Sequence, residues 1–286
     1  MMNPILSIAG RLARLTPMFV KRGIYHLPWF NQLIRKVLNR LAPKDITTVS
    51  IVAGGLEGAR LSLDMQTEKD YWLGMYEPDL QKAITDWVKV GQIVYDVGAN
   101  IGYITLLIAR AVGQEGHIFA FEALPANLER LRTNLALNGV NDRVTVVAAA
   151  VVDVSKEVRF LVGPSLGTGK VEGAAGREAV IYSDSIRVEG IALDTFVFED
   201  GNPAPDLIKM DIEGGEVLAI LGMKKILQQA QPLMFLELHG PEAERVVWEE
   251  LVSCGYRLCW MKPSYPEVAC VDSLGWKAYV VAIPSK

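Results

Sequence analysis

Acidic residues stand directly after several apolar runs of this sequence, where they could hold a cofactor or accept a proton. Asp96 ends the run IVYD, Glu122 ends HIFAFE, Asp211 ends LIKMD, and His239 closes LMFLELH. Each run has the length and composition of a buried strand. Ligands of open α/β sheets bind beyond the carboxyl ends of the strands, so we expect these three acids and the histidine to converge at one edge.

The loop after Asp96, in VYDVGANIGYIT, has the glycines of a nucleotide-binding turn but lacks what phosphates require. A P-loop needs the pattern GxxxxGK[ST], and no such lysine and hydroxyl pair follows Gly98. A dinucleotide loop needs GxGxxG, whereas Asn100 replaces the second glycine and Gly102 is out of place. The second glycine lets the backbone approach the pyrophosphate, so the sequence argues against a dinucleotide.

A cofactor without phosphate fits this loop better. S-adenosylmethionine carries a carboxylate at its methionine end, which backbone N–H groups of the turn and of the helix start can receive. Its ammonium group would face Asp96, unless that acid only braces the loop. Glu122 lies 24 residues after Gly98, where an acid can bind both ribose hydroxyls. Both acids could be structural caps, but their place at consecutive strand ends favours contact with a ligand.

Methyl transfer to a hydroxyl needs an aligned acceptor and a base, and the same edge offers candidates for the base. The ordinary pKa of His239 suits a base, and Asp211 could orient the ring or act itself. Glu216 could serve only the dipole of its helix, and Glu237 could point away from the cleft because side chains alternate along a strand. We expect Asp211, His239 and Glu213 to be catalytic, although a histidine after a strand can also be structural.

A metal ion is the competing interpretation of the same residues. Asp211, Glu213 and His239 are acceptable ligands for a divalent cation, which would lower the pKa of an acceptor hydroxyl. The sequence has no tightly spaced ligand pattern such as HxxxH around them. We therefore do not favour metal dependence.

The stretch 163–185 is rich in Gly, Ser and Ala and is the best candidate for a loop that a ligand orders. It contains Lys170, Glu172 and Arg177, which could bind the acceptor if the loop folds over the site. The alternative is that these three are solvated loop charges.

Apolar runs and helical periodicities alternate through most of the chain, which predicts a doubly wound, mostly parallel sheet with helices on both faces. The last two runs, YRLCWM and WKAYVVAIP, have no helix between them and predict an antiparallel edge. The other expected strands cover 93–97, 117–121, 144–149, 206–211 and 233–238, and the expected helices cover 102–112, 125–138, 215–228 and 241–254.

Two segments precede this core. Residues 1–45 form a basic arm with two amphipathic helical pieces, and residues 46–90 form a hairpin around GGLEG followed by a helix. The core then spans 91–286. Residues 1–44 carry eight Lys and Arg and no acid, in a chain with a formal net charge of −4. The arm could dock on the core or on a second copy of the chain in a homo-oligomer, or could contact anionic lipid peripherally.

Composition indicates which cellular compartment and which binding partners to expect. Half of the 286 residues are apolar and 22% are charged, which allows a sizeable core. The three cysteines form no CxxC pair, as is typical of reduced thiols in a cytoplasmic protein. We expect a cytoplasmic chain, peripheral to the inner membrane surface if the arm binds lipid. The main domain is acidic, so nucleic acid is not an expected partner.

Three stretches in this order, DVGANIGYIT, AFEALPANLERLRTNLALNG and LIKMDIEGGEVLAILGM, resemble the FkbM family of S-adenosylmethionine-dependent methyltransferases. The resemblance covers roughly residues 90–261. It implies the seven-stranded class I methyltransferase sheet, Rossmann-like, with an antiparallel last strand. It also places Ala149 and Ala150 near the adenine, as backbone or small apolar contacts. The cofactor-binding residues that it implies are Asp96, Gly98, Ala99, Asn100, Gly102, Tyr103, Glu122, Ala123 and Asp211.

The resemblance implies an O-methyltransferase acting on a hydroxyl of a sugar, glycolipid or secondary metabolite. An RNA or protein methyltransferase is the alternative enzyme, although the chain lacks an NPPY-like motif for a planar amine. A catalytically silent module that binds the cofactor or recruits partners to a membrane is the alternative of another class. The intact Asp96, Glu122 and Asp211 argue against it.

Overall fold

The computed structural model describes residues 45–163, 169–175, 180–182 and 184–285, which fall into two compact units that meet at Pro78 and Asp79. The sequence analysis placed the corresponding boundary at residue 90. The amphipathic pieces expected in residues 1–44 lie outside the described residues.

From residue 45 onward, where it is described, the first unit contains the predicted hairpin and one short helix. Strands β1 (Thr47–Ser50) and β2 (Arg60–Leu63) pair antiparallel, with Thr47 opposite Leu63. Helix α4 (Lys69–Leu73) follows and ends at Gly74, whose φ of 72° is left-handed. A Cβ on Gly74 would lie 1.8 Å from the carbonyl oxygen of Ala53, so only glycine fits this approach.

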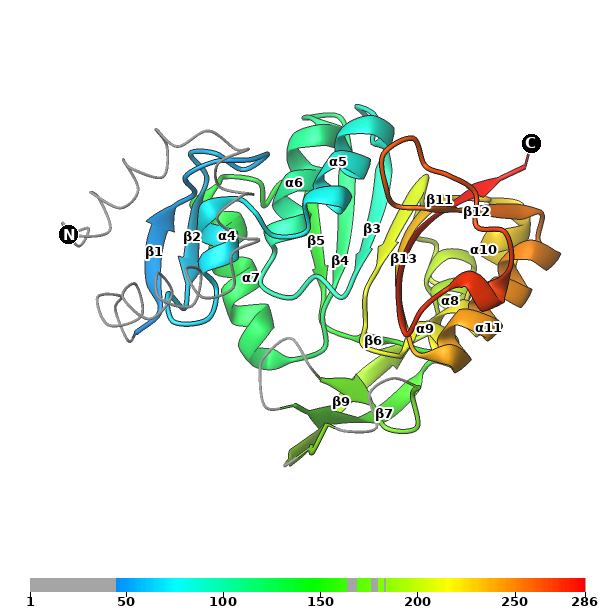
Figure 1. Ribbon diagram of the computed structural model, residues 1–286. Coiled ribbons are helices and arrows are strands. Elements are labelled where there is room, and N and C mark those ends of the chain that lie inside the picture. The colour runs from blue at the N-terminus through cyan, green and yellow to red at the C-terminus, as the bar shows by residue number, and fades with distance from the viewer. Residues whose placement is uncertain (1–44, 164–168, 176–179, 183, 286) are drawn as a thin grey trace. The chain divides into compact units, whose positions relative to one another are not determined.

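The second unit is built on a seven-stranded sheet with the order β12-β13-β11-β10-β3-β4-β5. The pairs among β11, β10, β3, β4 and β5 are parallel, and β13 lies antiparallel between β11 and β12. This confirms the predicted Rossmann-like sheet with its antiparallel late strand (Figure 1). The strands are β3 (Ile93–Val97), β4 (His117–Phe121), β5 (Val144–Val147), β10 (Leu207–Met210), β11 (Leu233–His239), β12 (Tyr256–Trp260) and β13 (Lys277–Pro284).

Helices cover the sheet on both faces, as buried parallel strands require. Figure 1 shows α8 to α11 gathered beside β11, β12 and β13, and α5 and α6 near β3 and β4. The bounds are α5 (Pro78–Trp87), α6 (Tyr103–Val112), α7 (Pro125–Leu137), α8 (Leu193–Phe198), α9 (Glu216–Leu221), α10 (Lys224–Gln229), α11 (Pro241–Ser253) and the 3₁₀ helix η1 (Val271–Ser273).

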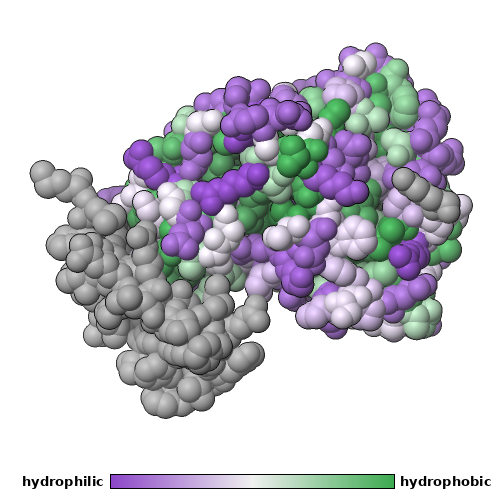
Figure 2. Space-filling view, turned by 90° about the horizontal axis from the view of Figure 1, so that it is seen from above, coloured by the Kyte–Doolittle hydropathy of each residue, from purple (hydrophilic) through white to green (hydrophobic). Residues whose placement is uncertain are grey.

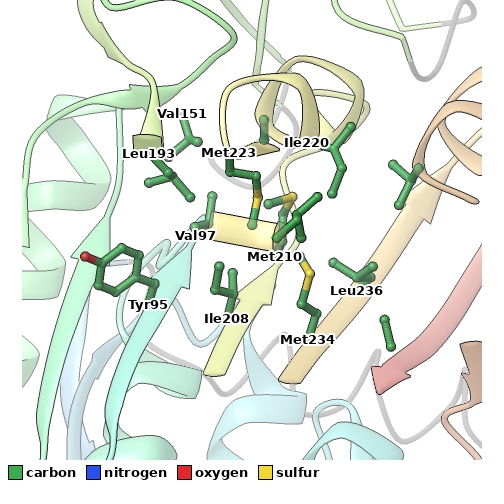
Figure 3. Packing of buried hydrophobic residues seen from close by; sticks show 14 of the residues in the cluster. Tyr95, Val97, Val151, Leu193, Ile208, Met210, Ile220, Met223, Met234 and Leu236 are labelled. Atoms are coloured by element: carbon green, nitrogen blue, oxygen red, sulfur yellow. The ribbon is translucent and has the colours of Figure 1, made fainter. Parts of the chain in front are cut away.

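Alternation along the strands divides the sheet into an apolar face and a face with polar positions. In β3, Tyr95 and Val97 belong to the large core cluster under α8, α9 and α10. Figure 3 shows Met210 and Met234 of neighbouring strands directed toward Met223 and the helices above them. Asp96, between Tyr95 and Val97, points to the opposite face, where Thr105 of α6 contacts it.

A second, four-stranded sheet is the main departure from the expected fold. Its order is β6-β9-β7-β8, and two residues separate its first strand from the end of β5 (Figure 1). One strand was expected over 144–149, whereas this stretch supplies β5 to one sheet and leads directly into β6 of the other. The bounds are β6 (Ala150–Val151), β7 (Lys156–Val162), β8 (Lys170–Val171) and β9 (Asp184–Ile191).

The helix expected over 215–228 is two helices, α9 and α10, separated at Gly222 and Met223. Gly222 packs against the chain after β6, because a Cβ there would lie 2.1 Å from the carbonyl oxygen of Val152. The contact requires the backbone to come close, and the break lets α10 turn back onto α8.

None of the helices within the described parts of the chain combines the length and the apolarity needed to span a bilayer. On the face that Figure 2 shows, hydrophobic residues are interrupted by hydrophilic ones.

The aromatic cluster under α8 yields a stability prediction. Phe196 stacks edge-on against Tyr95, Phe119 and Phe121, with ring centroids 5.3 to 5.8 Å apart. Phe196→Ala should lower the free energy of unfolding by about 3–5 kcal/mol, because it removes a buried ring and leaves a cavity. Phe198→Ala on the same helix is the control, since Phe198 is 40% exposed, and should cost less than about 1 kcal/mol. Equal losses in urea denaturation would contradict this packing.

Candidate functional site at the carboxyl edge of the sheet

The loop 98–102 between β3 and α6 adopts a conformation that its residue types explain. Gly98 and Gly102 have φ of 81° and 89°, and Asn100 has φ of 50°. Asparagine tolerates this left-handed region better than most residues, so it can stand where a dinucleotide loop has glycine. A Cβ on Gly98 would lie 2.0 Å from the carbonyl oxygen of Asp211. The glycine at 98 therefore brings the loop against the end of β10.

The N–H groups of this loop are mostly used within the protein. Gly98 and Ala99 both donate to the carbonyl oxygen of Phe121, and Gly102 donates to that of Ala99. The sequence indicated the N–H groups of both the turn and the helix start for the cofactor carboxylate, and those of the turn instead hold β3 and β4 together. The first turn of α6, which begins at Tyr103, is the better candidate, because a helix start has N–H groups without intrahelical partners.

Asp96 braces the loop from below. The residue is fully buried, its Oδ2 accepts a hydrogen bond of 2.6 Å from Thr105 Oγ1, and its Oδ1 lies 3.2 Å from Lys209 Nζ. Lys209 stands opposite Asp96 in the register of β10 and β3 and donates to the carbonyl oxygen of Gly98 at 2.9 Å. Of the two roles considered for Asp96, the contacts support the brace.

Glu122 ties the loops after β3 and β4 to each other. Its Oε2 accepts a hydrogen bond of 2.8 Å from the N–H of Asn100, and its Oε1 accepts one of 2.8 Å from the N–H of Leu124. Burial raises the pKa of Glu122 above its ordinary value, although donors from Leu124, Asn100, Asn127 and Ala123 partly offset this. The predicted contact with ribose hydroxyls stays a prediction beside this structural role.

Beyond these loops, the ends of β10 and β11 and the start of α9 bring acids around His239. The ring is fully buried. Its Nδ1 lies 3.2 Å from Glu216 Oε1, and its Nε2 lies 2.9 Å from Glu237 Oε1. The same Nε2 is 4.0 Å from Asp211 Oδ1 and 3.9 Å from Glu213 Oε2. The three residues predicted to be catalytic therefore do meet, and we call them together with Glu216 and Glu237 the histidine cluster.

A sharp turn of the backbone determines which side of the histidine cluster is exposed. Glu213 has φ of 53° and Gly214 has φ of 100°, so the chain turns sharply between β10 and α9. Left-handed φ is costly for a glutamate and persists only where the surroundings impose it. The side chains of Asp211 and Glu213 are 23% and 18% exposed, whereas those of Glu216 and His239 are not exposed. The two acids from this turn are thus the ones that a ligand can reach.

Charges in the histidine cluster shift the protonation of its members. Burial favours the neutral ring of His239, but the nearby carboxylates of Glu216, Glu237 and Asp211 outweigh it and raise the pKa to about 10. Burial likewise opposes ionisation of Glu237, yet His239 and Lys277 hold its pKa below the ordinary value. A ring with that pKa is protonated at neutral pH. His239 in this arrangement therefore holds carboxylates and is not ready to accept a proton.

The predicted acceptor loop is only partly described. Val171 and Ala174 pack in one small cluster with Ala123, Ala150 and Leu218, which places β8 beside the end of β4 and the start of α9. Lys170 Nζ donates to the carbonyl oxygens of Ala174 and Ala175.

Of the other two predicted acceptor residues, only Glu172 is described, and its contact gives no support. Glu172 forms an ion pair of 2.9 Å with Arg159, and both side chains are more than half exposed. Arg177 lies outside the described residues. Ala149 and Ala150 are both buried near the end of β5.

Sequence reasoning did not assign four residues that the structure brings into these networks. The concern that Glu237 could point away is wrong, since Glu237 and His239 are two apart on β11 and share a face. Glu216 does more than serve the helix dipole, because it accepts the Ile212 N–H and contacts His239. Lys277 of β13 contacts Glu237. Lys209 had a visible signal, a lone lysine in the apolar run LIKM.

The close approach at Gly98 yields a test of the loop. Gly98→Ala should abolish S-adenosylmethionine binding in calorimetric titration, because the new Cβ must displace the carbonyl of Asp211. Gly91→Ala is a matched control: Gly91 has φ of 83°, but its Cβ would meet nothing within 4 Å. Both variants carry the same backbone strain, about 1–2 kcal/mol, so only the clash differs. Normal binding by Gly98→Ala would refute this role of the loop.

The buried ion pair yields a second test. Lys209→Met should lower the free energy of unfolding by about 3–5 kcal/mol, because it leaves the buried Asp96 carboxylate without its cation. Lys224→Met serves as the control, since Lys224 and Glu250 form an exposed pair of 2.8 Å and its loss should cost less than about 1 kcal/mol. Chemical denaturation measures both, and similar small losses would show that the pair does not brace the loop.

Comparison with known proteins agrees with this geometry. Residues 96–258, more than half of the chain, match the family model of the methyltransferase FkbM domain. The hexuronic acid methyltransferase AglP of Haloferax volcanii is 26% identical over 170 residues, which cover 57% of this chain and 63% of that protein.

Solved structures show similarity at a lower level. A methyltransferase FkbM from Methylobacillus flagellatus is 16% identical, with a TM-score of 0.46 over 78% of this chain and 55% of that one. A putative rRNA-methylase from Clostridium thermocellum is 13% identical, with a TM-score of 0.46 over 72% and 94%. The family match covers both the loop 98–102 and the histidine cluster. The chain belongs to the FkbM family of S-adenosylmethionine-dependent methyltransferases.

Proposed function

We propose that this chain transfers the methyl group of S-adenosylmethionine to a hydroxyl of a sugar acid, with a hexuronic acid as the acceptor class. The relative from Haloferax volcanii, whose name gives hexuronic acid as its substrate, supports this class of acceptor. This chain spans less than two thirds of that relative's length. The acceptor class therefore needs its own test.

The observation that carries the proposal is the contact between the cofactor loop and the acid beyond β10. The carbonyl oxygen of Asp211 lies 2.0 Å from where a Cβ on Gly98 would be, and the Asp211 side chain is partly exposed beside the buried His239. A cofactor held at the loop 98–102 thus has its reacting end next to a carboxylate. Such proximity is what an in-line transfer requires, since the acceptor oxygen must line up with the methyl carbon.

The reaction balances with groups that the chain supplies. The acceptor oxygen forms a bond to the methyl carbon as the carbon–sulfur bond breaks, and the electron pair of that bond leaves with sulfur as a neutral thioether. The hydroxyl proton goes to a base. We assign this role to Asp211, because His239 already carries a proton at neutral pH. His239, whose Nε2 lies 4.0 Å from Asp211 Oδ1, then holds the Asp211 carboxylate in position.

Lys170 is the residue that we propose for the acceptor's carboxylate. Its strand β8 packs beside Ala123, the residue after Glu122, and beside Leu218 of α9. Its ammonium group binds two backbone carbonyl oxygens, and an ammonium can exchange such partners for an anion. A hexuronic acid would then be held by its carboxylate while a ring hydroxyl faces Asp211.

A matched pair of sugars tests the acceptor class. Incubation with labelled cofactor should transfer label to glucuronate or galacturonate and much less to glucose or galactose, which lack only the carboxylate. The product should keep its label in mild alkali, because a methyl ether is stable there and a methyl ester is not. Label lost in alkali would place transfer on the carboxylate and overturn the hydroxyl assignment, and equal labelling of the neutral sugars would overturn the acceptor class.

Asp211→Asn tests the base. It should reduce kcat about 100-fold or more and leave cofactor binding intact, since a general base acts on the transition state. Asp142→Asn is the control: Asp142 is exposed and precedes β5 at the other edge of the sheet. Unchanged kcat in Asp211→Asn would assign the proton to another group.

A further inference from the structure

We propose that Asp211, Glu237 and His239 form a binding site for one divalent first-row metal ion, with Glu213 at its open side. Each of the three offers one ligand atom, and these atoms all lie within 4.8 Å of one another. The three come from two strand ends, β10 and β11, that the parallel sheet fixes side by side. The site needs no rearrangement of the fold to assemble.

The distances between donor atoms match those around a metal ion. With bonds of about 2.1 Å, two ligands at right angles are about 3 Å apart and two opposite ligands about 4.2 Å apart. His239 Nε2 lies 2.9 Å from Glu237 Oε1, 4.0 Å from Asp211 Oδ1 and 3.9 Å from Glu213 Oε2. The Glu237 distance matches ligands at a right angle, and the other two distances fall between the two values, as for ligands that subtend a wide angle at one ion.

The state of the imidazole gives independent support. His239 is fully buried, and its Nε2 makes no aligned hydrogen bond although it faces the carboxylates. A buried polar nitrogen without such a bond is costly, so it indicates a missing partner. A metal ion that displaces the Nε2 proton and binds the lone pair left there would be that partner.

Glu216 supplies the support that metal-binding histidines ordinarily have. Its Oε1 lies 3.2 Å from His239 Nδ1, on the far side of the ring from the proposed ion, and also accepts the Ile212 N–H at 3.1 Å. A carboxylate on Nδ1 fixes the proton there and leaves Nε2 free to bind metal. We infer that Glu216 is a positioning residue for the ion.

Lys277 does not exclude the ion. Its ammonium group contacts Glu237 Oε1, the same oxygen that lies 2.9 Å from His239 Nε2. An ionised carboxylate has about four lone-pair sites over its two oxygens, so a metal ion can take one of them while the ammonium group keeps another. The mixed set of imidazole and carboxylate donors favours ions such as Mn²⁺ or Zn²⁺ over Ca²⁺.

The ion would assist the methyl transfer proposed above, a consequence that rests on that proposed function. Asp211 and Glu213 are the partly exposed members, so the open coordination positions face the side that a ligand can reach. A hydroxyl bound there would lose its proton more readily, and the Asp211 oxygen that does not bind the ion is left to accept that proton.

Binding of Mn²⁺ to the full chain tests the site without cofactor or acceptor. After chelator treatment, the wild type should remove one equivalent of Mn²⁺ from the free-ion signal in electron paramagnetic resonance. Electron spin-echo spectra should show coupling to an imidazole nitrogen. Absence of binding at millimolar Mn²⁺, or binding without nitrogen coupling, would overturn the site.

Variants identify the ligands. Asp211→Asn and Glu237→Gln should each weaken Mn²⁺ binding at least 10-fold, and Glu216→Gln should weaken it about 10-fold through the ring. Glu129→Gln, the same change at an exposed position on α7, should bind like the wild type. Asp211 is partly exposed, so its variant should fold even if the buried ones do not. Wild-type affinity in Asp211→Asn would overturn the proposal.

The two proposals can fail separately. Mn²⁺ binding is read without acceptor, so failure to methylate sugar acids would leave the metal site standing. Turnover that persists unchanged in chelator, in a protein that binds no Mn²⁺, would remove the metal site and leave hydroxyl methylation intact.

Discussion

The ion pair between Lys209 and Asp96 is the interaction on which the cofactor side of this structure depends. It joins β10 to β3 at facing positions inside the sheet, and the same lysine holds the carbonyl of Gly98. Two charges placed in such an environment are unfavourable unless both are satisfied, so the pair specifies one register and one loop geometry. The loop 98–102 can then approach Asp211 closely because its base is fixed.

The polar residues of the site share one face of the sheet. Asp96 and Lys209 lie opposite the apolar core under α8 to α10, and Glu237 and His239 continue the same face on β11. The two networks differ in exposure: the first is closed and structural, and the second opens through Asp211 and Glu213. This division explains how one sheet edge can be rigid beneath a cofactor and still present reactive carboxylates to a ligand.

The sequence predicted the parts of this structure whose signals are local. Strands β3 and β4 lie at their predicted bounds, because strands buried on both faces read as apolar runs. The second sheet was missed, since β7 has no fully buried residue and β6 and β8 have two residues each. The proximity of Asp211, Glu213 and His239 could be predicted, because the carboxyl ends of neighbouring strands meet at one edge of the sheet. Glu216, Glu237 and Lys277 could not be assigned, because the direction of a side chain depends on register and packing across elements distant in sequence.

The position of β13 has a consequence for how the chain folds during synthesis. This strand is the last of the sheet in the chain, yet it lies between β11 and β12 and delivers Lys277 to Glu237. Until residues 277–284 have left the ribosome, β11 has an unpaired edge and Glu237 lacks its cation. A nascent chain would therefore hold the glycine loop and most of the core before the histidine cluster is complete, and ribosome pausing in this interval would expose an open strand edge to aggregation.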